Sequence, residues 1–150
     1  MAIDGMTDLV SEIRSLQLNG RNTKRALVPA AVYLRDLMRE KFDANVTTIP
    51  EQWGYIRTGT IRDAIRWWYI GSDSAPTGVM VGISHAVKHP RVTPDGDNFT
   101  AAQLGWWLEG GTRHVRARRF MQSAVMDGTP NIKRIIKEAY DRHIKEAQQS

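Results

Sequence analysis

The sequence predicts an α+β fold in which a small antiparallel β-sheet packs against a long N-terminal helix and a C-terminal helix. Three observations lead to this fold class. Apolar residues recur every three or four positions toward both ends of the chain. Aromatic and β-branched residues alternate with other residues in two central segments, and Gly- and Pro-rich stretches separate these patterns. Helices that flank one small sheet most simply cover one face of it.

Two helices are expected in the first third of the chain. Thr7 can cap a short helix. Its apolar residues are Leu9, Val10, Ile13 and Leu16. A longer helix follows, with an apolar stripe that continues to about Asn45. Because proline lacks a backbone N–H, this helix either starts at Pro29 or is kinked there.

The centre of the chain predicts a β-hairpin between two loops. Residues 46–59 have the composition of an irregular loop. The alternation over 65–70 and again over 79–83 predicts two strands, joined by a turn-rich stretch as an antiparallel hairpin. Residues 84–98 contain two prolines and a glycine, so we expect an exposed, mobile loop there.

The last third predicts two short helical segments and one long helix. Thr100 and Gln103 have the spacing of a capping box and open a short helix that ends at two glycines, Gly110 and Gly111. Residues 112–116 are compatible with a strand, and residues 120–126 with one or two helical turns.

The dipeptide Asp127-Gly128 is expected to stop that second helical segment. The next dipeptide, Thr129-Pro130, then begins the cleanest amphipathic pattern in the sequence.

Length and composition restrict the class of protein. The chain has 150 residues, of which 41% are hydrophobic and 25% are charged, so we expect a single domain over residues 1–150. It contains no cysteine, which excludes disulfides, thiol nucleophiles and cysteine-ligated metals. No apolar run approaches the roughly 20 residues needed to cross a bilayer, so we expect no membrane partner. The net charge of +5 is a weak indication of nucleic acid or an acidic partner.

Catalytic and metal-binding patterns are not evident. His85 and His89 are four residues apart, a spacing that aligns two imidazoles only on a helix, whereas these two follow a predicted strand. A solvated histidine pair is the simpler interpretation, with a metal-dependent hydrolase as the alternative. The sequence has neither a Gly-x-Ser-x-Gly elbow nor a phosphate-binding glycine loop. We therefore expect no catalytic, cofactor-binding or metal-binding residues and no enzyme activity.

Two pairs of tryptophans and one arginine cluster are candidate binding residues. The pairs are Trp67-Trp68 and Trp106-Trp107, and they fill either the core or a subunit interface. The cluster consists of Arg113, Arg116, Arg118 and Arg119. Guanidinium groups bind phosphates of nucleic acid or carboxylates of a partner subunit equally well. A small basic nucleic-acid-binding domain is therefore the alternative to an interface protein.

Two segments resemble signatures of one protein family. Residues 57–65, RTGTIRDAI, resemble the signature tGxLrxSI. Residues 107–112, WLEGGT, and 117–124, ARRFMQSA, resemble the signature vExGT…a.PFl.pA. Both are typical of the gp-ten-like minor tail, neck or tail-completion family of long-tailed bacteriophages. The positions that carry the resemblance are Thr58, Gly59, Glu109, Gly111, Thr112, Phe120 and Ala124. Arg119 stands where the family usually has proline.

The resemblance implies a structural virion protein of the phage head–tail junction, assembled in the host cytoplasm. Such a protein forms a ring, expected to be a hexamer, that completes the tail and joins it to the connector of the DNA-filled head. Its partners would be further copies of itself, the tail tube or tail terminator protein, and the head connector or stopper protein, with DNA passing through the lumen as a further contact. No cofactor is implied.

On this interpretation, the candidate interface residues are Trp67, Trp68, Trp106, Trp107, Glu109, Arg113, Arg116, Arg118 and Arg119. Glu109 against one of these arginines of a neighbouring subunit is the expected specificity contact.

Overall fold

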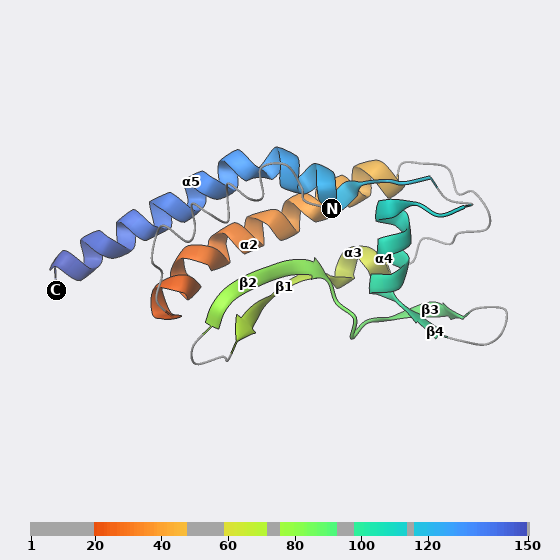
Figure 1. Cartoon of the computed structure of the whole chain (residues 1–150), viewed down its shortest axis with the longest axis horizontal. Coiled ribbons are helices and arrows are strands. Elements are labelled where there is room, and N and C mark those ends of the chain that lie inside the picture. Colours follow the sequence, from red (N-terminus) through yellow and green to blue (C-terminus); the bar gives the residue numbers. More distant parts are fainter. Residues whose placement is uncertain (1–19, 48–58, 72–75, 93–97, 114–115, 150) are drawn as a thin grey trace. The chain divides into compact units, whose positions relative to one another are not determined.

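A computed structural model describes residues 20–47, 59–71, 76–92, 98–113 and 116–149 (Figure 1). The helical elements are α2 (Gly20–Phe42), the π-helical turn η1 (Asp43–Thr47), α3 (Thr60–Ala64), α4 (Ala101–Gly110) and α5 (Phe120–Gln149). The strands are β1 (Ile65–Gly71), β2 (Pro76–Ile83), β3 (Lys88–Val92) and β4 (Asn98–Thr100). The predicted fold class is confirmed: the chain is α+β, with a small antiparallel sheet packed against long helices.

The chain divides into two compact units. The first, here called the helix–hairpin unit, comprises Met1–Asp36, Trp67–Val81 and Val125–Ser150. The second, here called the α4 unit, comprises Leu37–Arg66 and Gly82–Ala124. The expectation of one domain over residues 1–150 stays a prediction. The helix predicted from Thr7 lies outside the described residues, as does most of the loop predicted over 46–59.

The helix–hairpin unit is built from two long helices and the β1–β2 hairpin (Figure 1). Ala30 of α2 packs with Ile132 and Ile136 of α5 in its buried centre, and these side chains are 3 to 5% exposed. On the rim of this contact, the Asn131 Nδ2 donates to the Tyr33 hydroxyl at 3.0 Å. The stripe spacing predicted for both helices therefore does face a common core.

Pro29 lies inside α2, which begins at Gly20 rather than at the proline. A proline inside a helix leaves one carbonyl without its donor and costs stability. Pro29 is exposed, while Ala26 and Ala30 of the apolar stripe are buried, so the packing of this stripe offsets the lost hydrogen bond.

The predicted stop at Asp127-Gly128 is wrong, because α5 continues through it from Phe120 to Gln149. Gly128 is buried and extends a stripe that also contains Ala124 and Ile132, so burial outweighs the low helix propensity of glycine. The Thr129 hydroxyl does not cap a new helix. It donates to the Val125 carbonyl one turn earlier, at 2.6 Å.

The α4 unit contains the second sheet, in a segment for which the sequence predicts a loop. Strand β3 pairs with β4 in antiparallel orientation, with Lys88 opposite Thr100 and Val92 opposite Asn98. Because each strand is an edge strand, the proline inside β3 is tolerated. The remainder of the predicted loop at 93–97 lies outside the described residues, and its mobility stays a prediction.

Helix α3 was not expected from the sequence, which has too few residues there for a periodic pattern. The side chains of Ile61 in α3 and of Ile65, the first residue of β1, are at most 2% exposed. The Ala64 carbonyl accepts from the Ser84 N–H at 2.9 Å, which fixes the end of α3 to the end of β2. Among the described helices, none is both long and apolar enough to span a membrane.

Candidate partner-binding surface

The end of α4 and the start of α5 are joined by the side chain of Glu109. Its two carboxylate oxygens accept the backbone N–H groups of Met121 (2.9 Å) and Gln122 (2.8 Å). These N–H groups belong to the first turn of α5, where a helix has no intrahelical acceptor for them. A negative charge is also favoured at a helix N-terminus. Glu109 thus caps α5 from within the chain, and its predicted contact with a neighbour's arginine stays a prediction.

The chain returns from α4 to α5 along the end of α4. Gly111 ends α4 with φ 77°, a conformation that favours glycine. The Arg118 N–H then donates to the Leu108 carbonyl at 2.7 Å, and the Arg119 N–H to the Glu109 carbonyl at 3.3 Å. Asn45, from η1, donates its Nδ2 to the Arg118 carbonyl at 3.1 Å. These contacts fix the described residues of segment 112–119 in an irregular conformation. Among them, the structure does not contain the strand that was considered over 112–116.

The family-like positions that the structure describes lie together in the α4 unit. Gly59 has φ 75° and its carbonyl accepts the Asp63 N–H, which starts α3. Phe120 is fully buried and meets Phe42 edge to face, with ring centroids 5.1 Å apart. Ala124 is also fully buried. Phe120 and Ala124, with the half-buried Glu109 and Gly111, build the junction of the unit, whereas Gly59 and Thr112 are exposed. Thr58 lies outside the described residues.

Helix α4 has one buried and one exposed face. Its buried face consists of Ala101, Ala102, Gly105 and Leu108. Its exposed face, here called the α4 surface, consists of Gln103, Trp106, Trp107 and Gly110. Trp106 is 71% exposed and Trp107 is 43% exposed, so neither is a core tryptophan. The spacing i, i+3, i+4, i+7 could have located this face in the sequence, because the small residues and Leu108 follow the complementary spacing.

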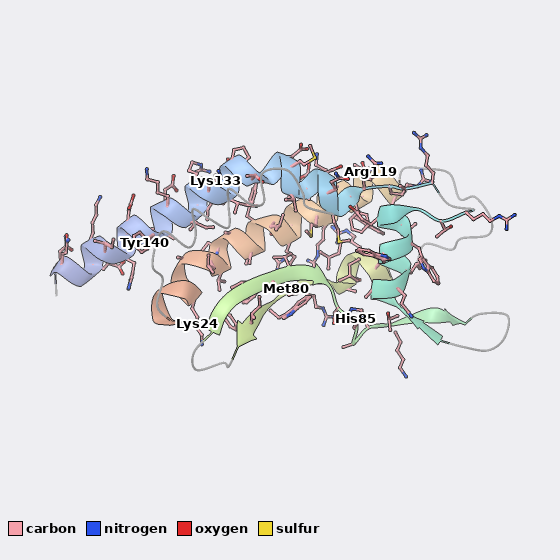
Figure 2. All side chains as sticks on the ribbon, in the orientation of Figure 1. Lys24, Met80, His85, Arg119, Lys133 and Tyr140 are labelled. Atoms are coloured by element: carbon pink, nitrogen blue, oxygen red, sulfur yellow. The ribbon has the colours of Figure 1, made fainter. Side chains whose placement is uncertain are left out.

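The arginine cluster adjoins the α4 surface in sequence. Arg113, Arg116 and Arg119 are exposed and Arg118 is half-buried. Within the described ranges, no carboxylate lies at ion-pair distance from these four guanidinium groups. Figure 2 marks Arg119 at the start of α5. Among the described residues, the cluster therefore presents positive charge that no described carboxylate pairs with, and Arg113, Arg116 and Arg119 present it at the surface.

The first tryptophan pair belongs to the other unit and its two members differ. Trp67 is half-buried and contacts the Tyr69 ring edge to face, at 5.4 Å between centroids. Trp68 points to the opposite face of β1, where it is 37% exposed and its neighbour Ile70 is 43% exposed. A Cβ placed on Gly78 would lie 3.6 Å from Ile70 Cδ1, so β2 presents Gly78 to this same face.

Met80, two residues beyond Gly78, therefore shares that face and is 47% exposed. Trp68, Ile70 and Met80 together are here called the hairpin surface; Figure 2 marks Met80 on it. The candidate interface residues thus fall into two groups, one in each unit.

The α4 unit also holds a partly exposed ion pair that sequence reasoning missed. Arg62 Nε lies 2.9 Å from both carboxylate oxygens of Asp43. This hydrogen bond, and then the charge of Asp43, raise the pKa of Arg62 above its usual value. Arg39 Nη2 donates to the Ile65 carbonyl at 2.9 Å. These groups tie the end of α2 and η1 to α3 and β1, which is a structural role.

The metal-site alternative depends on His85 and His89. Among the residues that it describes, no three His, Asp or Glu side chains are grouped so as to hold a metal ion. His85 lies in a turn and is exposed, and the side chain of His89 is outside the described set.

Comparison of this chain with protein-family models, with curated proteins and with solved structures finds no match.

Proposed function

We propose that the protein is a ring-forming structural subunit of the head–tail junction of a long-tailed bacteriophage, located in the virion. The observation that carries the proposal is the presence of two exposed apolar surfaces on one chain, the α4 surface in one unit and the hairpin surface in the other. The ordered sequence motifs supply the phage assignment.

Exposed tryptophans favour an assembly role on energetic grounds. Burial of a large apolar side chain contributes about 1.5 to 3 kcal/mol. Trp106 at 71% exposure and Trp68 at 37% exposure forgo much of this in the isolated chain. Tryptophan is also among the residues that contribute most to protein interfaces. Both side chains would therefore gain stability by contact with a second protein.

Two different surfaces on one subunit are what a ring requires. In a head-to-tail ring each subunit meets one neighbour through one surface and the other neighbour through a different one, and a subunit of a junction must bind the adjoining structures as well. The proposed partners are further copies of the chain, expected to be six in a ring, the tail tube or terminator protein, and the head connector or stopper protein. No catalytic step is proposed.

The test compares two substitutions of exposed apolar residues. Trp106→Ser removes a side chain of the α4 surface, and Met126→Ser, at a position that is 56% exposed on α5, serves as the control. Each variant is mixed with purified tail tubes and assayed by light scattering and electron microscopy. We expect the control to join the tubes and Trp106→Ser to fail, with both folded by circular dichroism. A wild-type chain that never associates with itself, with tubes or with connectors would overturn the proposal.

Nucleic-acid binding is the second candidate, and the exposed Arg113 and Arg116 favour it. If these residues contact phosphates, DNA affinity should fall steeply between low and moderate salt. The charge-removing pair Arg113→Gln and Arg116→Gln should then weaken binding and flatten the salt dependence. Binding that is unaffected by the pair would remove this candidate.

A further inference from the structure

We propose that residues 1–19 of one copy of the chain dock on the α4 surface and the adjoining arginines of a second copy. The inference rests on the self-assembly proposed above and names the segment that covers the α4 surface in the ring. It is carried by complementarity of charge and of apolar pattern between these two parts of the sequence.

Residues 1–19 differ in charge from the rest of the chain. They contain three acidic residues, Asp4, Asp8 and Glu12, and one basic residue, Arg14, which gives a net charge of −2. The whole chain carries +5, so the other residues together carry +7. An acidic segment on an otherwise basic chain is attracted to the basic parts of the same chain or of its copies.

The acidic residues of this segment border its apolar stripe. Asp8 and Glu12 are four residues apart, and each directly precedes an apolar residue, Leu9 and Ile13. Since successive residues of a helix are about 100° apart, the helix that the sequence predicts in this segment carries an acidic stripe beside an apolar one. Leu16 continues the apolar stripe.

The α4 surface and its arginines have the matching pattern. Trp106 and Trp107 supply exposed aromatic area at the end of α4. Arg113 and Arg116 follow them, exposed and without an ion pair among the described residues. The apolar stripe of the segment can thus cover the tryptophans while its carboxylates meet the guanidinium groups, each pair in charge-assisted contact.

The hairpin surface fits the acidic segment less well. Strands β1 and β2 contain a single charged residue, Arg66, against four arginines in the segment after α4. A contact between an N-terminal segment and α4 also joins two different parts of the chain. Contacts of that kind between copies are heterologous, and they form a ring when the rotation between neighbouring copies closes.

The chain has no cysteine, so single cysteines report this contact without background. Gln17 lies four residues after Ile13, beside the apolar stripe, and Gly110 lies on the α4 surface with no atom within 4 Å of an added Cβ. Gln17→Cys is mixed with a size-tagged Gly110→Cys chain and oxidised. Ser11→Cys, on the opposite side of the predicted helix, replaces Gln17→Cys in the control.

We expect the Gln17→Cys mixture to give about tenfold more mixed disulfide dimer than the Ser11→Cys control, because docking raises the local concentration of the two thiols. Equal yields would contradict the inference. The doubly substituted chain Q17C/G110C should give a ladder of linked chains. A monomer with an internal disulfide would instead assign the segment to its own chain and would also overturn the inference.

Charge reversal provides a second readout. Asp8→Arg with Glu12→Arg should lower the yield of mixed dimer, and Arg113→Glu with Arg116→Glu in the tagged chain should restore it. If the cysteines at 17 and 110 do not cross-link but the chain still assembles into tails, this inference is wrong and the proposed function is unaffected. If they cross-link but the chain never joins tails or connectors, the proposed function is wrong instead.

Discussion

Arg119 has a backbone conformation that is rare for a residue with a side chain. Its φ is 49°, in the left-handed region, and it directly precedes the first residue of α5. In this region the Cβ crowds the following carbonyl and costs about 1 to 2 kcal/mol. The conformation turns the chain so that the first N–H groups of α5 reach the Glu109 carboxylate.

Two substitutions at Arg119 should therefore have opposite effects. Arg119→Gly should raise the free energy of unfolding by about 1 kcal/mol, because glycine adopts positive φ freely. Arg119→Pro should lower it by about 3 kcal/mol, since proline is fixed near −65° and lacks the N–H that donates to the Glu109 carbonyl. Urea unfolding monitored by tryptophan fluorescence measures both. Arg116→Gly, exposed and without positive φ, is the control and should not stabilise the protein.

Glu109 should contribute more to the free energy of unfolding than a glutamate that makes only an exposed ion pair. Glu109→Ala leaves two N–H groups at the start of α5 without their acceptor, and we expect a loss of about 1 to 2 kcal/mol. Glu138→Ala breaks only an exposed pair with Arg134 and should cost under about 0.5 kcal/mol. Thermal unfolding of both variants would distinguish them, and equal losses would contradict the capping role.

The contribution of the Arg62–Asp43 ion pair to the free energy of unfolding should be small and should not change with pH near neutrality. Asp43 raises the pKa of Arg62 above its unfolded value, so the stabilisation is present below that value and is lost only as the pH rises beyond about 12. Both side chains are more than 40% exposed, so Arg62→Ala should cost at most about 1 kcal/mol. Urea midpoints measured between pH 6 and about 9 should show the same small difference from wild type throughout. A difference that grows across this range would contradict the assignment.

On the scale of elements, the packing of α4 depends on the missing side chain of Gly105. A Cβ at this position would overlap Ile83 Cδ1 and lie 3.6 Å from Ile61 Cγ2. The glycine thus lets α4 approach the ends of β2 and α3 closely. Its cost in helix propensity is offset by this packing.

Substituting each of two glycines of α4, Gly105 and Gly110, by alanine should distinguish the effect of packing on stability from the effect of helix propensity. Gly105→Ala should lower the free energy of unfolding by about 1 kcal/mol, because Ile83 must move. Gly110→Ala, with open space around it, should be neutral or stabilising. Adding Ile83→Val, which removes the overlapping Cδ1 atom, should recover part of the loss. Equal effects of the two alanines in urea unfolding would contradict this account.

Local signals predicted some elements and failed for others. The capping box at Thr100 is present, with the Gln103 N–H donating to Thr100 Oγ1 at 3.2 Å, because it depends on a few neighbouring residues. Two predictions were wrong: the helix stop at Gly128, which lies inside α5, and the loop over 84–98, part of which is strand β3. In both cases the local structure depends on contacts with residues far away in the sequence. Burial carries α5 past Gly128, and pairing with β4 makes β3 a strand.

For the molecule as a whole, the fold class was predictable because helical and strand periodicity needs no knowledge of partners. The candidate surface was predictable only in part. Sequence singled out Trp106 and the arginines, but whether a tryptophan lies in the core depends on the face it occupies in the fold. The role of Glu109 was not predictable, because its partners lie in a different helix.

Assembly should respond to charge without a change in stability. Arg113→Glu with Arg116→Glu alters the net charge by −4, from +5 to +1. Because both side chains are exposed, the unfolding midpoint should stay within the range of ordinary surface substitutions, about 0.5 kcal/mol. The assembled fraction, measured by sedimentation, should fall and lose its sensitivity to salt. An assembled fraction equal to that of wild type would exclude these arginines from the contact.

The junction made by Glu109 also has an evolutionary consequence. Its carboxylate caps a helix of the same chain, whereas the side chain of Trp106 is 71% exposed. Descendants of a common ancestor that adapt to different binding partners would then change the residue at 106 together with the surface that contacts it, and would retain an acidic residue at 109. The residues that such proteins share, and by which their common origin is recognised, would be those that maintain the fold. The residues that differ between them would be those that contact each protein's own binding partner.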